Sequence, residues 1–263
     1  MPLLSPRIYR KRVPVNGVVF SSAVIPSIKS WRIPRNIGYA LFLFVVFSPV
    51  LPAQTVVKFQ PLLNGDVLEL GDGLVTERSQ STGAKQVEVL RWYLSDIEFL
   101  RNGKVVFTPK KRHHLLDAEI PKSLDLQLAT DTSLLYDELR FTLGVDSLTA
   151  ASGAFGGDLD PTNGMYWTWR SGYINFKLEG TSPACPARKN RFQFHVGGFQ
   201  GPFASQRKVS LAVTPAAVIR IDLDFDRFFK AVDLRKQYQV MSPNEASAEL
   251  ADLLAGVFRM HQE

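Results

Sequence analysis

Short runs of alternating apolar and polar residues recur along this chain, and most of them end at a turn signal. The longest run covers residues 86–100, and Asn102-Gly103 then predicts a hairpin into residues 104–107. Similar runs cover residues 56–60, 137–145, 192–196, 209–213 and 218–225. Because successive side chains of a strand point to opposite faces, many short strands must bury one face each in a shared core. The pattern predicts a mainly β protein, an antiparallel β-sandwich.

The apolar period changes near the C-terminus. Ser242-Pro-Asn-Glu245 is a capping box with proline at the first helical position. Apolar residues from Ala246 to Phe258 then follow at helical spacing. We therefore expect a C-terminal α-helix that covers a sheet, and a second helix over residues 225–236.

The most distinctive segment covers residues 158–180. Pro161 and Asn163-Gly164 favour a turn, and Trp167 and Trp169 follow in what reads as an alternating strand. The two tryptophans would then share one face, which we expect the C-terminal helix to cover, with a partner protein as the alternative. The segment lacks the distal glutamate of a calcium-binding loop, which favours a plain turn.

The N-terminal residues 1–53 have the composition of a signal peptide with a long basic n-region. They hold seven lysines and arginines and no acidic residue. The apolar run over residues 37–51 is roughly 15 residues long, whereas a membrane span needs roughly 20. We predict cleavage near Ala53, export to the periplasm or medium and no span after cleavage, with an uncleaved anchor as the alternative. The remaining domain would cover residues 54–263.

The basic charge of the chain belongs to that leader. Without it, 24 basic residues stand against 25 acidic ones, which argues against nucleic-acid binding. We find no serine elbow, phosphate loop or CxxC motif, so the sequence predicts no catalytic residues, no organic cofactor and no enzyme activity. The one cysteine, Cys185, excludes an internal disulfide.

Histidines are the candidate metal ligands. His113 and His114 are neighbours, so on a strand only one of them can face a given site. His195 precedes Gly197-Gly198, where the backbone can be approached closely. One of the pair together with His195 would give a low-coordinate site suited to copper or zinc. The alternative is that all three are ordinary strand histidines with hydrogen-bonded rings.

The chain resembles the MbnP-like domain family of exported bacterial proteins, which are related to the methanobactin-associated MbnP and the methanotroph protein CorA. The order and spacing of the matching segments agree from about residue 55 to residue 258. The residues that carry the resemblance are 90–97 (LRWYLSDI), 114–117 (HLLD), 139–146 (LRFTLGVD), 159–173 (LDPTNGMYWTWRSGY) and 194–198 (FHVGG).

The resemblance implies a β-rich, non-catalytic copper-binding protein. Its copper would be held by histidines and by a kynurenine, which a dihaem cytochrome c peroxidase-like partner (MbnH-like) makes from a tryptophan. Carried onto this sequence, His195 matches the histidine before the double glycine, and His114, or else His113, takes the place of a second ligand. Two residues before His114 this chain has Arg112 rather than a tryptophan. The alternative function is a structural or partner-binding β-sandwich that has lost the metal site.

Overall fold

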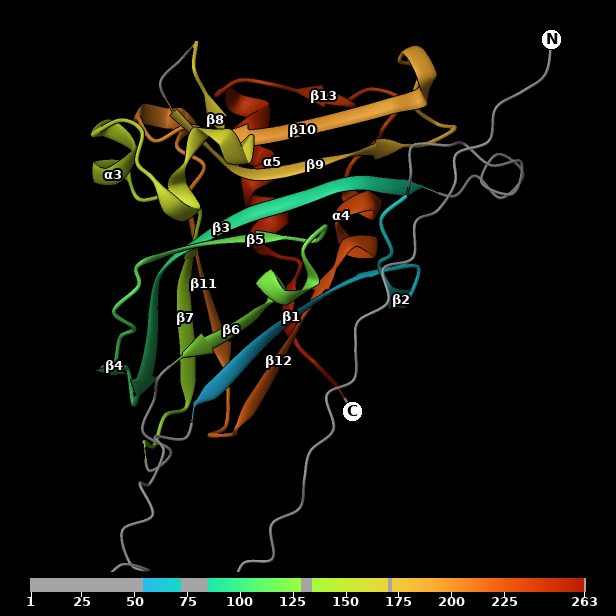
Figure 1. The fold of residues 1–263 in the computed structure, drawn as a ribbon. Helices are drawn as coiled ribbons and strands as arrows, with labels where there is room; N and C mark the ends of the chain where they lie inside the picture. The colour runs from blue at the N-terminus through green and yellow to red at the C-terminus, as the bar shows by residue number, and fades with distance from the viewer. Residues whose placement is uncertain (1–53, 72–84, 129–133, 170–171, 263) are drawn as a thin grey trace, which may run out of the picture. The chain divides into compact units, whose positions relative to one another are not determined.

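Strand β3 (Gln86–Arg101) is the strand on which most of the larger sheet is built (Figure 1). The computed structural model describes residues 54–71, 85–128, 134–169 and 172–262. Along one edge β3 pairs with β5 (His113–Asp117) and β4 (Lys104–Phe107), and along the other with β9 (Gly172–Thr181) and β7 (Glu138–Leu143).

Two sheets contain the described strands. The larger has the order β11 (Arg207–Ala212), β7, β3, β9, β10 (Arg191–Gly197) and β13 (Gln239–Val240), with β8 (Tyr166–Trp167) paired to β9. The smaller has the order β14 (Phe258–Met260), β12 (Val218–Asp224), β1 (Thr55–Leu63) and β2 (Asp66–Val67), with β6 (Asp125–Leu128) paired to β1. Two pairs, β1–β12 and β10–β13, are parallel, and the other described pairs are antiparallel.

The main core draws its side chains from both sheets. Trp92 of β3 is fully buried and stacks on Phe176 of β9, with ring centroids 5.9 Å apart. Phe59 of β1 meets Trp92 edge to face, and Ile221 of β12 belongs to the same cluster. The predicted mainly β sandwich with a C-terminal helix is confirmed.

Two longer helices complete this core. Helix α4 (Phe225–Ala231) buries Phe228, and α5 (Glu245–Ala255) buries Leu250 and Leu254. The side chain of Asn244, rather than that of Ser242, caps α5 by accepting a hydrogen bond from the N–H of Ser247 at 2.8 Å. The chain returns to a strand, β14, at Phe258, so the predicted helices are present but end earlier than expected.

A second, smaller core lies on the outer face of the larger sheet. Tyr93 and Tyr173 pack edge to face there, and their hydroxyls donate to the carbonyls of Asp158 and Leu159. Helix α3 (Ser147–Ala151) and the short 3₁₀ turns η2 (Gly157–Leu159) and η3 (Pro161–Asn163) cover this face. The segment over residues 157–164 is therefore a plain turn, as the sequence favoured, and it closes the second core.

The two tryptophans of the distinctive segment have different surroundings. Trp167 is 5% exposed and belongs to the smaller core, whereas Trp169 is 63% exposed. They differ because β8 ends at Trp167 and the chain then turns. The expectation that the C-terminal helix covers both is wrong, since Leu250 and Leu254 of α5 belong to the main core.

The other short elements are the 3₁₀ turns η1 (Pro121–Leu124), η4 (Arg188–Asn190) and η5 (Gly201–Phe203). Cys185 is free and buried. The predicted signal peptide lies outside the described residues. In the part of the chain that the structure describes, every helix is too short or too polar to cross a bilayer.

Gly197 lies where β10 meets both β9 and the smaller core. A Cβ added there would lie 2.5 Å from the carbonyl oxygen of Tyr173 and 2.7 Å from the ring of Trp167. We expect Gly197→Ala to lower the free energy of unfolding by about 1–3 kcal/mol, as overpacking does. Denaturant unfolding measures this. Gly156→Ala is the control, because nothing lies within 4 Å of its added Cβ, and an equal loss in both variants would contradict the packing argument.

Candidate functional site

The three predicted metal-ligating histidines lie on two strands that β3 and β9 separate. His113 and His114 belong to β5, and His195 belongs to β10. The strand order across this part of the sheet is β5, β3, β9 and β10. Three strand spacings of roughly 4.8 Å each therefore lie between the pair and His195.

Strand register puts His114 and His195 on opposite faces of the sheet. His114 pairs with Leu94, whose side chain lies in the main core with that of Trp92. His195 pairs with Lys177, which pairs in turn with Arg91 on the outer face. Paired residues of neighbouring strands point to the same face, so the two histidines do not meet.

His113 shares the outer face with His195 but lies far along the sheet. His113 pairs with Ser95 of β3. His195 pairs with Lys177 of β9, which pairs with Arg91 of β3, four residues before Ser95. Four residues of strand are roughly 13 Å, in addition to the strand spacings. The structure thus brings neither His113 nor His114 close to His195.

His195 is held by a buried carboxylate. Its Nε2 lies 2.8 Å from Oε1 of Glu179, and both side chains are about nine-tenths buried. The hydrogen bond from His195, with help from Gln193 and Lys177, outweighs burial and holds the pKa of Glu179 at about 2. Glu179 is therefore ionised at neutral pH and can only accept a hydrogen bond.

That hydrogen bond sets the tautomer of His195. Because Glu179 accepts, Nε2 of the imidazole must carry the proton, and in the neutral ring Nδ1 then has the lone pair. No residue in the described ranges hydrogen-bonds to Nδ1. Metal-binding histidines are commonly oriented in this way, by a carboxylate on the ring nitrogen that does not bind the metal.

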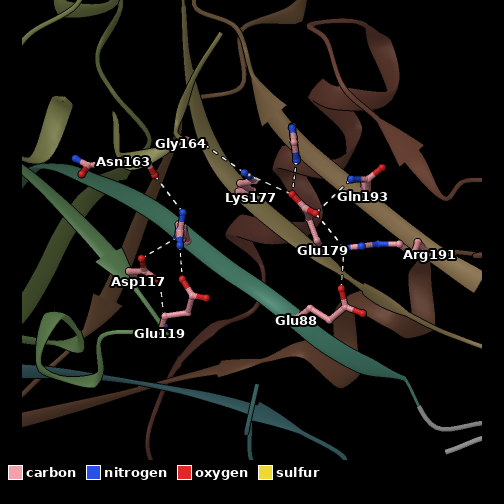
Figure 2. A network of polar contacts seen from close by, with 11 residues as sticks. Glu88, Asp117, Glu119, Asn163, Gly164, Lys177, Glu179, Arg191 and Gln193 are labelled. Atoms are coloured by element: carbon pink, nitrogen blue, oxygen red, sulfur yellow. Dashed lines mark hydrogen bonds and ion pairs between the residues drawn. The ribbon is translucent and has the colours of Figure 1, made fainter. Parts of the chain in front are cut away.

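The ring belongs to a wider ion-pair network on the outer face (Figure 2). Arg191 lies 2.7 Å from Glu88 and 3.5 Å from Glu179. Lys177 lies 3.5 Å from Glu179 and donates to the carbonyl of Gly164 at 3.3 Å. The network contains three cations and four anions, so its charges sum to −1 when His195 is neutral. The cations are Arg91, Lys177 and Arg191, and the anions are Glu88, Asp117, Glu119 and Glu179.

A methionine directly follows β13, the strand that pairs in parallel with β10. The parallel register pairs Gln193 with Gln239 and Phe194 with Val240, where β13 ends, so His195 and Met241 are each the next residue after the last pair. Val240 belongs to the main core, and Met241, which follows the strand, is half-buried. A thioether beside an imidazole is a donor set suited to Cu(I).

His113 and His114 have partners of their own. Nε2 of His113 lies 3.0 Å from Oδ2 of Asp146, and Nε2 of His114 lies 3.1 Å from the carbonyl of Lys111. Burial lowers the pKa of His114, which keeps its ring neutral. These bonds fix β5 to its neighbouring loops, which is the ordinary role that the sequence left open for them.

His261, near the C-terminus, is also held in place. Its backbone N–H donates to the carbonyl of Arg220, and its ring Nδ1 lies 2.9 Å from Oδ1 of the buried Asp222. Within the described ranges, the structure gathers no group of three histidine, cysteine or acidic side chains of a kind that holds a metal ion.

Sequence reasoning missed Glu179 and Met241. The alternation of Phe176, Lys177, Leu178 and Glu179 contains a signal for the former, because a charged residue every second position marks the face opposite the core. Met241 follows a two-residue strand that no periodicity reveals.

Comparison with known proteins identifies the family. The MbnP family model matches residues 52–242, which is well over half of the chain. The chain belongs to the MbnP family. Among solved structures, MbnP from Methylosinus trichosporium is similar with a TM-score of 0.49 and 16% sequence identity, covering 69% of this chain and 79% of that one. The search of curated proteins found no match.

Asp146 gives this MbnP-family chain a measurable pH dependence. Burial opposes its ionisation, but hydrogen bonds from Thr149 and His113 hold its pKa at about 2, below the 3.8 of a free aspartate. A carboxyl whose pKa is lower in the folded than in the unfolded state stabilises the fold at pH values above its unfolded-state pKa. This stabilisation is lost as the pH falls through its folded-state pKa.

As the pH falls from roughly 4 to 2, the free energy of unfolding of the wild type should therefore decrease by about 2 kcal/mol more than that of Asp146→Asn. Asparagine also caps helices, so the variant keeps that role at α3. Urea unfolding at a series of pH values measures the difference, and parallel profiles for the two proteins would contradict it.

Proposed function

We propose that this chain is an exported, non-catalytic copper-binding protein in which His195 and Met241 supply the ligands. The observation that carries the proposal is the β10–β13 register, which would set Met241 beside His195 if it continued by one residue. Imidazole and thioether groups both bind copper, and the thioether favours Cu(I). Membership of the MbnP family supports the same function.

The surroundings of His195 favour a bound cation. Glu179 would keep Nδ1 of His195 free for the metal and hold the orientation of the ring. The net charge of −1 on the network does not repel a cation. His113 and His114 would take no part, because register separates them from His195.

Titration of the purified protein with Cu(I) against a coloured chelator tests the ligand set. We expect His195→Ala and Met241→Leu each to weaken binding by at least tenfold, since each removes one donor atom. Leucine has nearly the volume of methionine, so the second variant should keep the fold. His113→Ala is the matched control, because its ring is also held by a carboxylate, and it should bind copper like wild type.

Wild-type affinity in His195→Ala, or weakened binding in His113→Ala alone, would contradict the assignment. Glu179→Gln adds a graded test. It removes the carboxylate behind the ring and should weaken Cu(I) binding by roughly 10–100-fold, as is usual for such partners of a ligand.

Export and the redox partner form part of the same proposal. The mature chain in the periplasm or medium should begin near Gln54, which N-terminal sequencing tests. A dihaem cytochrome c peroxidase-like protein, co-expressed with this chain, should change its intact mass by oxidation of a tryptophan. An unchanged mass would remove that partner from the proposal.

The second candidate function is a partner-binding sandwich without a metal. The observation that favours it is that each predicted histidine already holds a hydrogen bond that fixes the fold. A wild-type protein that binds no Cu(I) in the titration would select this function over the first.

A further inference from the structure

Three Asn-Gly pairs lie in turns of the described chain, and their hydrogen bonds differ. They are Asn64-Gly65, Asn102-Gly103 and Asn163-Gly164, while Asn16-Gly17 lies outside the described residues. An asparagine before a glycine is chemically labile, because the backbone nitrogen of the glycine can reach the asparagine side-chain carbon with no Cβ in the way. The attack needs that nitrogen to give up its proton, so a hydrogen bond donated by the glycine N–H opposes it.

Asn163-Gly164 is held at both of the groups that would react. The N–H of Gly164 donates to the carbonyl of Pro161 at 3.0 Å. The side chain of Asn163 is half-buried, and its Nδ2 donates to the carbonyls of Gly157 and Asp158 at 3.0 and 3.1 Å. Neither the backbone nitrogen nor the side-chain amide is free to turn toward the other.

Asn64-Gly65 is exposed but is held by a carboxylate. Oδ2 of Asp226 accepts from the N–H of Gly65 at 3.1 Å, and Oδ1 accepts from the N–H of Asn64 at 2.9 Å. Hydrogen bonds to an ionised group are among the stronger ones. The negative charge of Asp226 also disfavours loss of the Gly65 proton, because that would place a second anion beside it.

The turn between β3 and β4 leaves its glycine N–H without an acceptor among the described residues. Asn102 and Gly103 are exposed and have φ values of +50° and +73°, as a two-residue type I′ hairpin turn requires. The carboxylate of Asp137 accepts from the N–H of Asn102, at 3.0 and 3.2 Å, rather than from that of Gly103. Nothing lies within 4 Å of a Cβ added to Gly103, which leaves room for a ring to form.

We propose that Asn102 is a site of spontaneous deamidation in the folded protein, whereas Asn64 and Asn163 are protected. The nitrogen of Gly103 forms a bond to Cγ of Asn102. Its proton passes through water to the departing amide, which leaves as ammonia. A second step adds water to the succinimide ring and opens it at either carbonyl, giving aspartate or isoaspartate. The net reaction consumes one water and releases one ammonia, with no change of oxidation state.

The product loosens the β3–β4 hairpin. The new carboxylate lies close to that of Asp137, and two like charges repel. Isoaspartate also adds a methylene to the chain between Arg101 and Lys104, whose pairing sets the register of the hairpin. The backbone amides of β4 should therefore exchange with solvent faster after conversion.

Storage of the purified protein at mildly alkaline pH, sampled over days, tests the site. Digestion with endoproteinase Glu-C releases residues 99–119, in which Asn102 is the one asparagine. Mass spectrometry should show that this peptide gains about 1 Da through conversion of the amide to an acid. The rate should exceed those at Asn64 and Asn163 roughly tenfold or more, since a strong hydrogen bond is worth about that factor.

Two controls test the cause. In protein unfolded by urea the three asparagines should convert at similar rates, because each precedes a glycine. Asp226→Ala removes the acceptor of the Gly65 N–H and should raise the rate at Asn64 several-fold while the rate at Asn102 stays unchanged. Asn102→Gly suits the same turn and has no amide to lose, so its β4 amides should exchange equally before and after storage.

Conversion of Asn64 or Asn163 as fast as Asn102 in the folded protein would overturn the proposal. An Asn102 that stays intact in the folded protein but converts in urea would also overturn it. An unchanged rate at Asn64 in Asp226→Ala would overturn the protection assigned to the glycine N–H. Unchanged exchange of β4 in fully converted protein would overturn the effect on the hairpin.

Discussion

The structure depends on burial of both faces of β3. Trp92 and Leu94 point into the main core between the sheets, and Tyr93 points into the smaller core on the outer face. A strand buried on both sides, and paired along both edges, fixes the register of every strand that joins it. A shift of one residue would move Trp92 into the smaller core and Tyr93 into the main one.

This fixed register determines which side chains can share a site. It sends His114 to the core face and His195 to the outer face, although both lie on strands of the same sheet. On the outer face it places Glu179 and Lys177 beside His195, and it extends the row to Arg91. The buried Glu179 needs these partners, because an unpaired buried carboxylate is costly. The segment over residues 157–164 is attached to the same row through Asn163 and Gly164.

The sequence predicted the individual strands and helices better than it predicted which of them lie next to one another. Alternation identified the strands of the sandwich and apolar residues at helical spacing identified α5, because these signals are periodic and lie within one element, although Asn244 rather than Ser242 caps the helix. The sequence did not predict that Trp167 is buried and Trp169 exposed, because β8 ends at Trp167, two residues before Trp169. It also did not predict that β13 pairs with β10 just before Met241 and His195, since that pairing depends on a two-residue parallel strand and on long-range register. Register also separates the predicted histidine pair, which spacing in the sequence could not show.

The proposed copper site depends on His195, whose Nε2 is held by Glu179. Nuclear magnetic resonance of protein labelled with ¹⁵N at histidine reads the proton on each ring nitrogen directly. We predict that His195 carries its proton on Nε2, and that Cu(I) shifts the Nδ1 signal of His195 while those of His113 and His114 stay unchanged. A proton on Nδ1 of His195, or a copper-induced shift at His113 or His114 instead, would contradict the account.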